Sequence, residues 1–130
     1  MMRVITFGTF DVFHTGHLRI LERARAFGSL LVVGISTDDL NFKKKDRFPV
    51  YSQEERCEII RALRCVDKVF LEESLELKRY YLQEYHADIL VMGDDWAGKF
   101  DEFRDICRVE YLPRTPSIST TVVIEKIKLK

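Results

Sequence analysis

Short apolar runs alternate with amphipathic segments along almost the whole chain. The apolar runs predict five strands, at residues 3–7, 29–36, 68–71, 89–92 and 108–112. The first two runs, residues 3–7 and 29–36, are apolar throughout instead of alternating with polar residues, which is typical of parallel strands covered by helices on both faces. Apolar residues at helical spacing predict helices between the strands, from about His17 to Gly28, from Ser52, over residues 75–85 and 99–106, and from Ser119 to about Lys128.

This alternation indicates an α/β protein with right-handed crossovers. We expect a Rossmann-like three-layer sandwich with a central parallel sheet of about five strands. The chain contains no internal repeat, low-complexity segment or linker, so residues 1–130 are expected to form a single domain. The segment 38–50 carries three lysines and a proline, and we interpret it as a surface loop.

Composition narrows the class of protein without naming a function. The chain of 130 residues is 46% hydrophobic and 32% charged, as in soluble globular proteins. Its 21 basic and 21 acidic residues balance, so nothing indicates a nucleic-acid partner, and no apolar run is long enough to span a membrane. The three cysteines are widely spaced, and the sequence enters a strand pattern at once, so we expect reduced thiols and a cytoplasmic protein.

The strongest chemical signal is the run from Gly8 to His17, which lies between a predicted strand and a predicted helix. Backbone amides of such a turn and the positive end of the helix dipole attract a phosphate. Gly16 lets the backbone approach a ligand closely, and His14 and His17 can both donate an N–H to a phosphate oxygen. Two packing histidines, or half of a zinc site, remain alternatives for this run.

Three further polar segments also follow predicted strands, and should therefore meet at one edge of the sheet. Lys43–Lys45 with Arg47 could neutralise a polyphosphate, or could be an ordinary solvated loop. Arg114–Thr121 combines one arginine with hydroxyl groups at a helix start, which suits a second phosphate site or a simple capped turn. Gly93–Trp96 contains two aspartates that could bind a metal, act as acid and base, or accept hydrogen bonds from a nucleobase amino group.

Taken together, these motifs resemble the cytidylyltransferase branch of the nucleotidyltransferase superfamily. The resemblance covers essentially the whole chain, and its segments are Val4–Asp11, the His14-x-Gly16-His17 motif, Arg64-x-Val66-Asp67, Met92–Trp96 and Arg114–Thr121. Within this family the chain looks most like the bacterial members that serve teichoic acid precursor synthesis as homodimers. The resemblance implies that CTP and glycerol 3-phosphate react to give CDP-glycerol and pyrophosphate, with Mg²⁺ held through the triphosphate.

The resemblance also implies residue roles. His14 and His17 would stabilise the α-phosphate, Lys44 would bridge the acceptor and the triphosphate, and Arg114 would hold the β- and γ-phosphates. Lys44 and Lys78 would bind the acceptor. The nucleotide-binding set would comprise Gly8, Thr9, Phe10, His14, Thr15, Gly16, His17, Asp94, Trp96, Arg114, Thr115, Pro116, Ser117, Ile118, Ser119, Thr120 and Thr121. Further candidates are Asp11, Lys45, Arg47 and Arg56, together with Arg64 and Asp67, which match a family segment near the site and the dimer interface.

One position departs from the family pattern. Members often carry two loop lysines separated by one residue; the first matches Lys44, but Asp46 stands where the second would fall. Lys45 or Arg47 would have to substitute for it. The alternatives to the implied reaction are a related transferase that uses another acceptor (phosphocholine, phosphoethanolamine or a sugar phosphate) or ATP as donor, and a nucleotide-binding regulatory module without catalysis.

Overall fold

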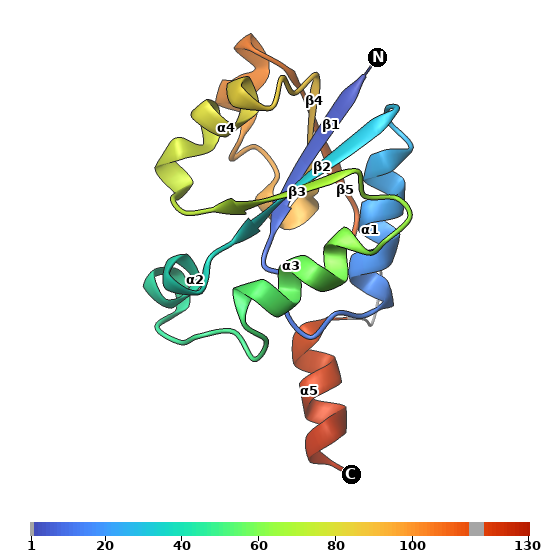
Figure 1. Cartoon of the computed structure of the whole chain (residues 1–130), viewed down its shortest axis with the longest axis vertical. Coiled ribbons are helices and arrows are strands. Elements are labelled where there is room, and N and C mark those ends of the chain that lie inside the picture. Colours follow the sequence, from blue (N-terminus) through green and yellow to red (C-terminus); the bar gives the residue numbers. More distant parts are fainter. Residues whose placement is uncertain (1, 115–118) are drawn as a thin grey trace.

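The computed structural model of the chain describes residues 2–114 and 119–130 (Figure 1). Five parallel strands form one sheet in the order β3-β2-β1-β4-β5. The strands are β1 (Arg3–Gly8), β2 (Leu30–Ser36), β3 (Lys68–Glu72), β4 (Ile89–Gly93) and β5 (Arg108–Leu112). The helices are α1 (Thr15–Arg25), α2 (Asp38–Lys45), α3 (Gln53–Arg61), α4 (Lys78–Glu84) and α5 (Thr120–Lys128), with short 3₁₀ segments η1 (Leu75–Leu77), η2 (Asp94–Trp96) and η3 (Asp101–Asp105).

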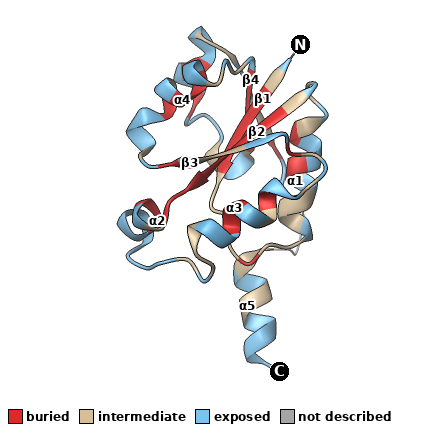
Figure 2. Ribbon diagram, in the orientation of Figure 1, coloured by how far each residue is buried: buried red, intermediate tan, exposed pale blue. Residues whose placement is uncertain are grey.

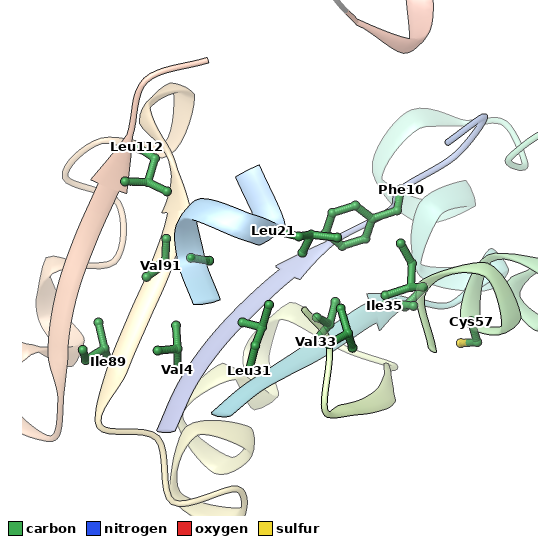
Figure 3. Close-up of a cluster of buried hydrophobic side chains, with 13 residues drawn as sticks. Val4, Phe10, Leu21, Leu31, Val33, Ile35, Cys57, Ile89, Val91 and Leu112 are labelled. Atoms are coloured by element: carbon green, nitrogen blue, oxygen red, sulfur yellow. The ribbon is translucent and has the colours of Figure 1, made fainter. Parts of the chain in front are cut away.

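The sheet separates two hydrophobic layers, which confirms the predicted three-layer α/β sandwich. One layer packs the sheet against α1 and α3, and Figure 3 shows Leu21 of α1 among side chains of the central strands. The other layer packs the opposite face against α4 and the η3 region, through residues such as Tyr81 and Phe103. The three central strands β1, β2 and β4 are almost entirely buried, because both their faces are covered, whereas the edge strand β3 is partly exposed (Figure 2).

The strand order places a topological switch point beside β1. The chain moves outward from β1 to β2 and β3, and then returns to the other side of β1 for β4 and β5. In open parallel sheets, ligands bind beyond the carboxyl ends of the strands at such a point. The segment after β1 (residues 9–17) and the segment after β4 (residues 94–96) therefore flank the expected crevice.

The prediction of a loop at residues 38–50 is wrong over its first half, because α2 occupies Asp38–Lys45. The hydroxyl of Thr37 caps this helix by accepting from the Leu40 amide, and Asp46 ends it in a left-handed conformation. Acidic residues in the first turn and lysines in the last complement the helix dipole. Only Leu40 and Asn41 of this helix are buried, so its sequence shows no apolar stripe.

The helix expected at residues 99–106 is also wrong in type. The structure has the short 3₁₀ helix η3 there, in which only Phe103 is buried. The last helix begins where predicted, with Ser119 as its N-cap. Helix α5 contains no buried residue and extends away from the sheet (Figures 1 and 2).

Candidate active site

The turn after β1 has an unusual backbone. Phe10 and Val12 have φ angles of 55° and 47°, although neither is a glycine, and such conformations cost free energy that the surrounding structure must supply. Gly8 permits this turn, because a Cβ atom there would lie only 2.8 Å from ring carbons of Phe10. The Phe10 ring in turn packs edge-on against His17, with 5.5 Å between the ring centroids. The strained turn thus places a histidine at the mouth of the crevice.

His14 and His17 cap the start of α1 with their own side chains. Nδ1 of His14 accepts from the Gly16 amide at 3.0 Å, and Nδ1 of His17 accepts from the His14 amide at 3.3 Å. Because each Nδ1 is an acceptor, each neutral ring carries its proton on Nε2. The two rings are stacked, with centroids 3.8 Å apart. The pair therefore offers two Nε2–H donors at a helix N-terminus.

Both histidines are held in the neutral form. Burial lowers the pKa of His14, and it lowers the pKa of His17 to about 4, with a smaller contribution from the neighbouring His14. Asp11 opposes this shift in the pKa of His17 but does not cancel it. At neutral pH the rings can donate hydrogen bonds, but they carry no formal charge.

The start of α5 meets this pair of histidines. The hydroxyl of Ser119 accepts from the Val122 amide as the N-cap, and the hydroxyl of Thr120 donates to the carbonyl of Asp11 at 2.9 Å. Since the Thr120 proton is used there, its oxygen is an acceptor toward Nε2 of His14, 3.4 Å away. Two helix N-termini more than 100 residues apart in sequence therefore share one site. Thr15 and Thr121 are exposed in the first turns of these helices.

Asp11 connects the turn after β1 to the chain segment before α3. Its carboxylate accepts hydrogen bonds from the amides of Val50 at 2.7 Å and Tyr51 at 2.9 Å, and from its own neighbour Val12 at 3.1 Å. The Thr9 hydroxyl is likewise engaged by protein, since it bonds Asn41 at 2.8 Å. These two side chains shape the site through protein contacts.

Arg56 lies at the centre of the same network and is completely buried. Its guanidinium donates to the carbonyls of Tyr51, Thr9 and Ser36 at 3.1, 2.9 and 2.8 Å, and pairs with Asp38 at 2.7 Å. It thereby joins the carboxyl ends of β1 and β2 to α2 and α3. The structure places Arg56 beneath the site as a support, and not at its surface.

The lysine cluster predicted as a loop lies in the last turn of α2. Lys44 is an exposed residue, but partial loss of hydration lowers its pKa, and the charges of Glu72 and Lys78 shift that pKa in opposite directions. These three groups therefore lie within electrostatic reach of one another. Lys45 and Arg47 are exposed at the same end of the helix.

Lys78 forms a buried ion pair with Glu72, at 2.6 Å. The lysine also lies over the ring of Phe7, with its Nζ 3.8 Å from the ring centroid. Glu72 is the last residue of β3, so this pair stands at the carboxyl edge of the sheet. The glutamate was not among the residues that the sequence singled out, and its only sequence signal is its place at the end of an apolar run.

The remaining predicted residues divide into three groups. Asp94 is exposed in η2, directly after β4, and Trp96 in the same segment packs against Phe100 with ring centroids 5.3 Å apart. Arg114 is exposed just beyond β5, where Arg23 of α1 donates to the carbonyl of Pro113 at 2.8 Å. The predicted residues Thr115, Pro116, Ser117 and Ile118 lie outside the described residues.

Arg64 and Asp67 do not belong to the crevice, and the expectation that they lie near the site is corrected. Arg64 is exposed in the connection that leads into β3. The carboxylate of Asp67 accepts from the Leu31 amide at the start of β2, at 2.8 Å, and pairs with Arg25 at 3.4 Å. Both residues thus lie at the amino edge of the sheet, because they precede β3 while the crevice follows the strands.

Some supporting residues escaped the sequence interpretation. Asn41 and Ser36 are buried polar residues, and the side-chain amide of Asn41 donates through Nδ2 to the Ser36 hydroxyl at 2.8 Å. Asp38 pairs with Arg56, as described above. The Ser36-Thr37-Asp38 run after an apolar strand is a typical N-cap pattern, and it could have indicated both the helix and the polar cluster.

A parallel sheet with two helix N-termini and paired Nε2–H donors at its switch point defines the class of this protein. It is a Rossmann-like α/β domain of the nucleotidyltransferase type. Residues 5–126 match the sequence profile of the family described as Cytidylyltransferase-like. The chain therefore belongs to the cytidylyltransferase-like family.

Individual relatives agree with this assignment. The chain is 48% identical over 127 residues to a glycerol-3-phosphate cytidylyltransferase of Bacillus subtilis, covering 98% of both proteins. It is 41% identical over 127 residues to a protein of the same name from Staphylococcus aureus, covering 98% of this chain and 96% of that protein. Among solved structures, the lipopolysaccharide core biosynthesis protein of Thermoplasma volcanium GSS1 superposes with a TM-score of 0.72 at 26% identity, over 88% of this chain and 97% of that one.

Proposed function

We propose that the protein is a glycerol-3-phosphate cytidylyltransferase, which transfers a cytidylyl group from CTP to glycerol 3-phosphate. The products are CDP-glycerol and pyrophosphate. Support for the choice of substrates comes from the names and full-length similarity of the relatives. The observation that carries the chemistry is the pair of stacked histidines, in which both Nδ1 atoms accept from backbone amides, so that each ring carries its proton on Nε2 as a donor.

In this reaction an oxygen of the acceptor phosphate attacks the α-phosphorus of CTP. The new phosphorus–oxygen bond forms as the bond to the β-phosphate oxygen breaks, and the electron pair leaves with pyrophosphate. A phosphate monoester is already a competent nucleophile, so the protein must supply position and charge stabilisation. We assign His14 and His17 to this task through their Nε2–H donors, since their lowered pKa values exclude a standing positive charge at neutral pH.

We assign the other roles as the family resemblance implies them. Lys44, at the end of α2, would bridge the acceptor and the triphosphate, and Lys78 would bind the acceptor. Arg114 together with the α5 N-terminus at Ser119 and Thr120 would hold the β- and γ-phosphates. Amides of Thr9 and Phe10 would line the triphosphate site, and Asp94 would read the amino group of cytosine.

Mg²⁺ would enter with the nucleotide. Within residues 2–114 and 119–130, no three His, Cys, Asp or Glu side chains gather as a ligand set. Mg²⁺ is commonly held by substrate phosphates with few protein ligands, so the fit is to the triphosphate, where the ion would neutralise charge on its oxygens. Removal of Mg²⁺ with EDTA is expected to abolish turnover, and added Mg²⁺ to restore it.

The proposal extends to assembly and location. We place the reaction in the cytoplasm, within teichoic acid precursor synthesis, and we expect a homodimer with Arg64 and Asp67 near its interface. No helix in the described part of the chain is long and apolar enough to cross a membrane. The molar mass from light scattering would decide the oligomeric state.

Pyrophosphate release, measured over a panel of nucleotides and acceptors, tests the reaction. CTP with glycerol 3-phosphate is expected to be the best pair. The panel includes ATP as donor, and phosphocholine, phosphoethanolamine and sugar phosphates as acceptors. Robust turnover with ATP and none with CTP would contradict the proposed donor, and preference for another phosphate monoester would contradict the proposed acceptor.

A further inference from the structure

The ion pair of Glu72 with Lys78 is unusually enclosed for two charged side chains. The relative exposures of the two residues are 2% and 4%, and their charged atoms are 2.6 Å apart. Around the ammonium lie the ring of Phe7, 3.8 Å from Nζ to its centroid, and the ring of Phe100, at 5.2 Å. Water can therefore supply little of the solvation that an ammonium group normally receives.

A buried ammonium needs a counterion to keep its proton. Burial lowers the pKa of Lys78, while the charge of Glu72 and the hydrogen bond to it raise that pKa. Aromatic faces attract a cation only weakly in comparison. In this enclosure Glu72 is thus the anionic group that holds the charge on Lys78.

The pair also stands where a ligand is expected. Glu72 ends β3 and pairs in register with Ser36 at the end of β2, while Lys78 begins α4. Lys44, in the last turn of α2, lies within electrostatic range of the pair, since the charges of Glu72 and Lys78 both shift its pKa, as do those of Lys45 and Arg56. One lysine thus contacts the Glu72 carboxylate at the carboxyl edge of the sheet, and a second lysine from another helix lies within electrostatic range of it.

An ion pair is not needed merely to anchor α4 to the sheet. Apolar residues of similar volume commonly stabilise a protein as well as a buried ion pair, or better, because charged groups lose their hydration on burial. Such a role would also leave unexplained why Lys44 lies within electrostatic range of the pair. A prearranged group of charges for an anionic ligand accounts for both features.

We propose that Glu72 is a positioning residue of the acceptor site, which keeps the Lys78 ammonium charged and fixed beside Lys44 so that the two lysines together receive the acceptor phosphate. This inference rests on the proposed function, since it takes the acceptor to be a phosphate monoester. Glu72 itself acts through Lys78. Its negative charge faces the lysine and offsets the hydration that the ammonium loses on burial, before the acceptor binds.

The test compares Glu72→Gln with Glu73→Gln. The first keeps the shape and an acceptor oxygen for Lys78 but removes the charge, while the second removes the same charge from an exposed neighbour. In Glu72→Gln the KM for glycerol 3-phosphate is expected to rise at least about 20-fold at pH 7. The ratio of this KM to the wild-type KM should grow from pH 7 to 9, because Lys78 loses its proton in the variant. The KM for CTP and kcat at saturating acceptor should stay within about threefold of wild type. Glu73→Gln should resemble wild type throughout.

An acceptor KM for Glu72→Gln that matches wild type and does not change its ratio with pH would overturn the inference, as would an equal rise in the KM for CTP. Should Glu72→Gln fail to fold, the double variant Glu72→Gln/Lys78→Met removes both charges and is compared with Lys78→Met. The acceptor KM of the double variant should then equal that of Lys78→Met. A higher acceptor KM in the double variant would refute action through Lys78. Turnover of the wild type with CTP and glycerol 3-phosphate, measured in the same series, tests the proposed function separately. If the wild type prefers another phosphate monoester, Glu72→Gln and Glu73→Gln are compared with that acceptor.

Discussion

Arg56 offers the sharpest test of how the crevice is held together. We consider Arg56→Lys, which preserves the positive charge but replaces a planar group of five donors by a single nitrogen. In the wild type, three different nitrogens of the guanidinium serve three backbone carbonyls and Asp38, at 2.7–3.1 Å. One ammonium cannot reach acceptors on opposite sides of the guanidinium, so at least two buried acceptors lose their donor.

The expected magnitude follows from that count. A buried acceptor left without a partner costs about 1–3 kcal/mol, so two of them lower the free energy of unfolding by about 2–6 kcal/mol. With a urea dependence of about 1.5 kcal/mol per M, a loss of about 3 kcal/mol moves the unfolding midpoint down by about 2 M. Because Arg56 joins the ends of β1 and β2, the KM for CTP should rise as well.

Urea unfolding followed by circular dichroism measures the effect, with Arg61→Lys as the matched control. Arg61 is an exposed arginine in the last turn of the same helix, so its replacement should change the free energy of unfolding by less than about 0.5 kcal/mol. The reasoning fails if the two variants have indistinguishable midpoints with equal slopes. Such a result would mean that the carbonyl groups find water or other donors at no cost.

Three further predictions concern the histidines and the α5 N-terminus. His14→Ala should lower kcat by at least about 100-fold, the usual effect of removing one hydrogen-bond donor that stabilises charge in a transition state. A kcat within about threefold of wild type would contradict the role of His14. Because the folded-state pKa of His17 is about 4, below the ordinary 6.5, its contribution to stability is complete above pH 6.5 and is lost as the pH falls towards 4, by up to about 3 kcal/mol. His17→Gln should therefore lose less stability than wild type between pH 6.5 and 4.5 in urea titrations, and parallel losses would argue against the lowered pKa. Thr120→Val should lower kcat about tenfold through loss of one hydroxyl that bonds Asp11 and His14, whereas Thr120→Ser, which keeps the hydroxyl, should not; equal activities would remove the Thr120 hydroxyl from the site.

The local signals in the sequence predicted the sheet closely. All five strands lie within one residue of their predicted bounds at each end, because a continuous apolar run flanked by polar residues has few other structures to adopt. The N-cap at Ser119 and the helix that follows the Gly8–His17 run were also predictable from short-range chemistry. The segment from Asp38 to Lys45 was not, because its helix depends on the Thr37 cap and on burial of Leu40 and Asn41, and neither leaves an amphipathic pattern.

The sequence by itself thus determined the α/β class, the family and the chemical character of the site. Each of these is encoded in neighbouring residues, through the apolar pattern of a strand or the residue types of a short motif. Only the tertiary structure decided that Thr120 reaches His14, that Arg56 supports the site from beneath, and that Asp67 lies at the opposite edge. It alone brought Glu72 to Lys78 in a buried ion pair. These relations depend on which strand ends lie side by side and on which charges lose their water, and both are settled only when the whole chain packs.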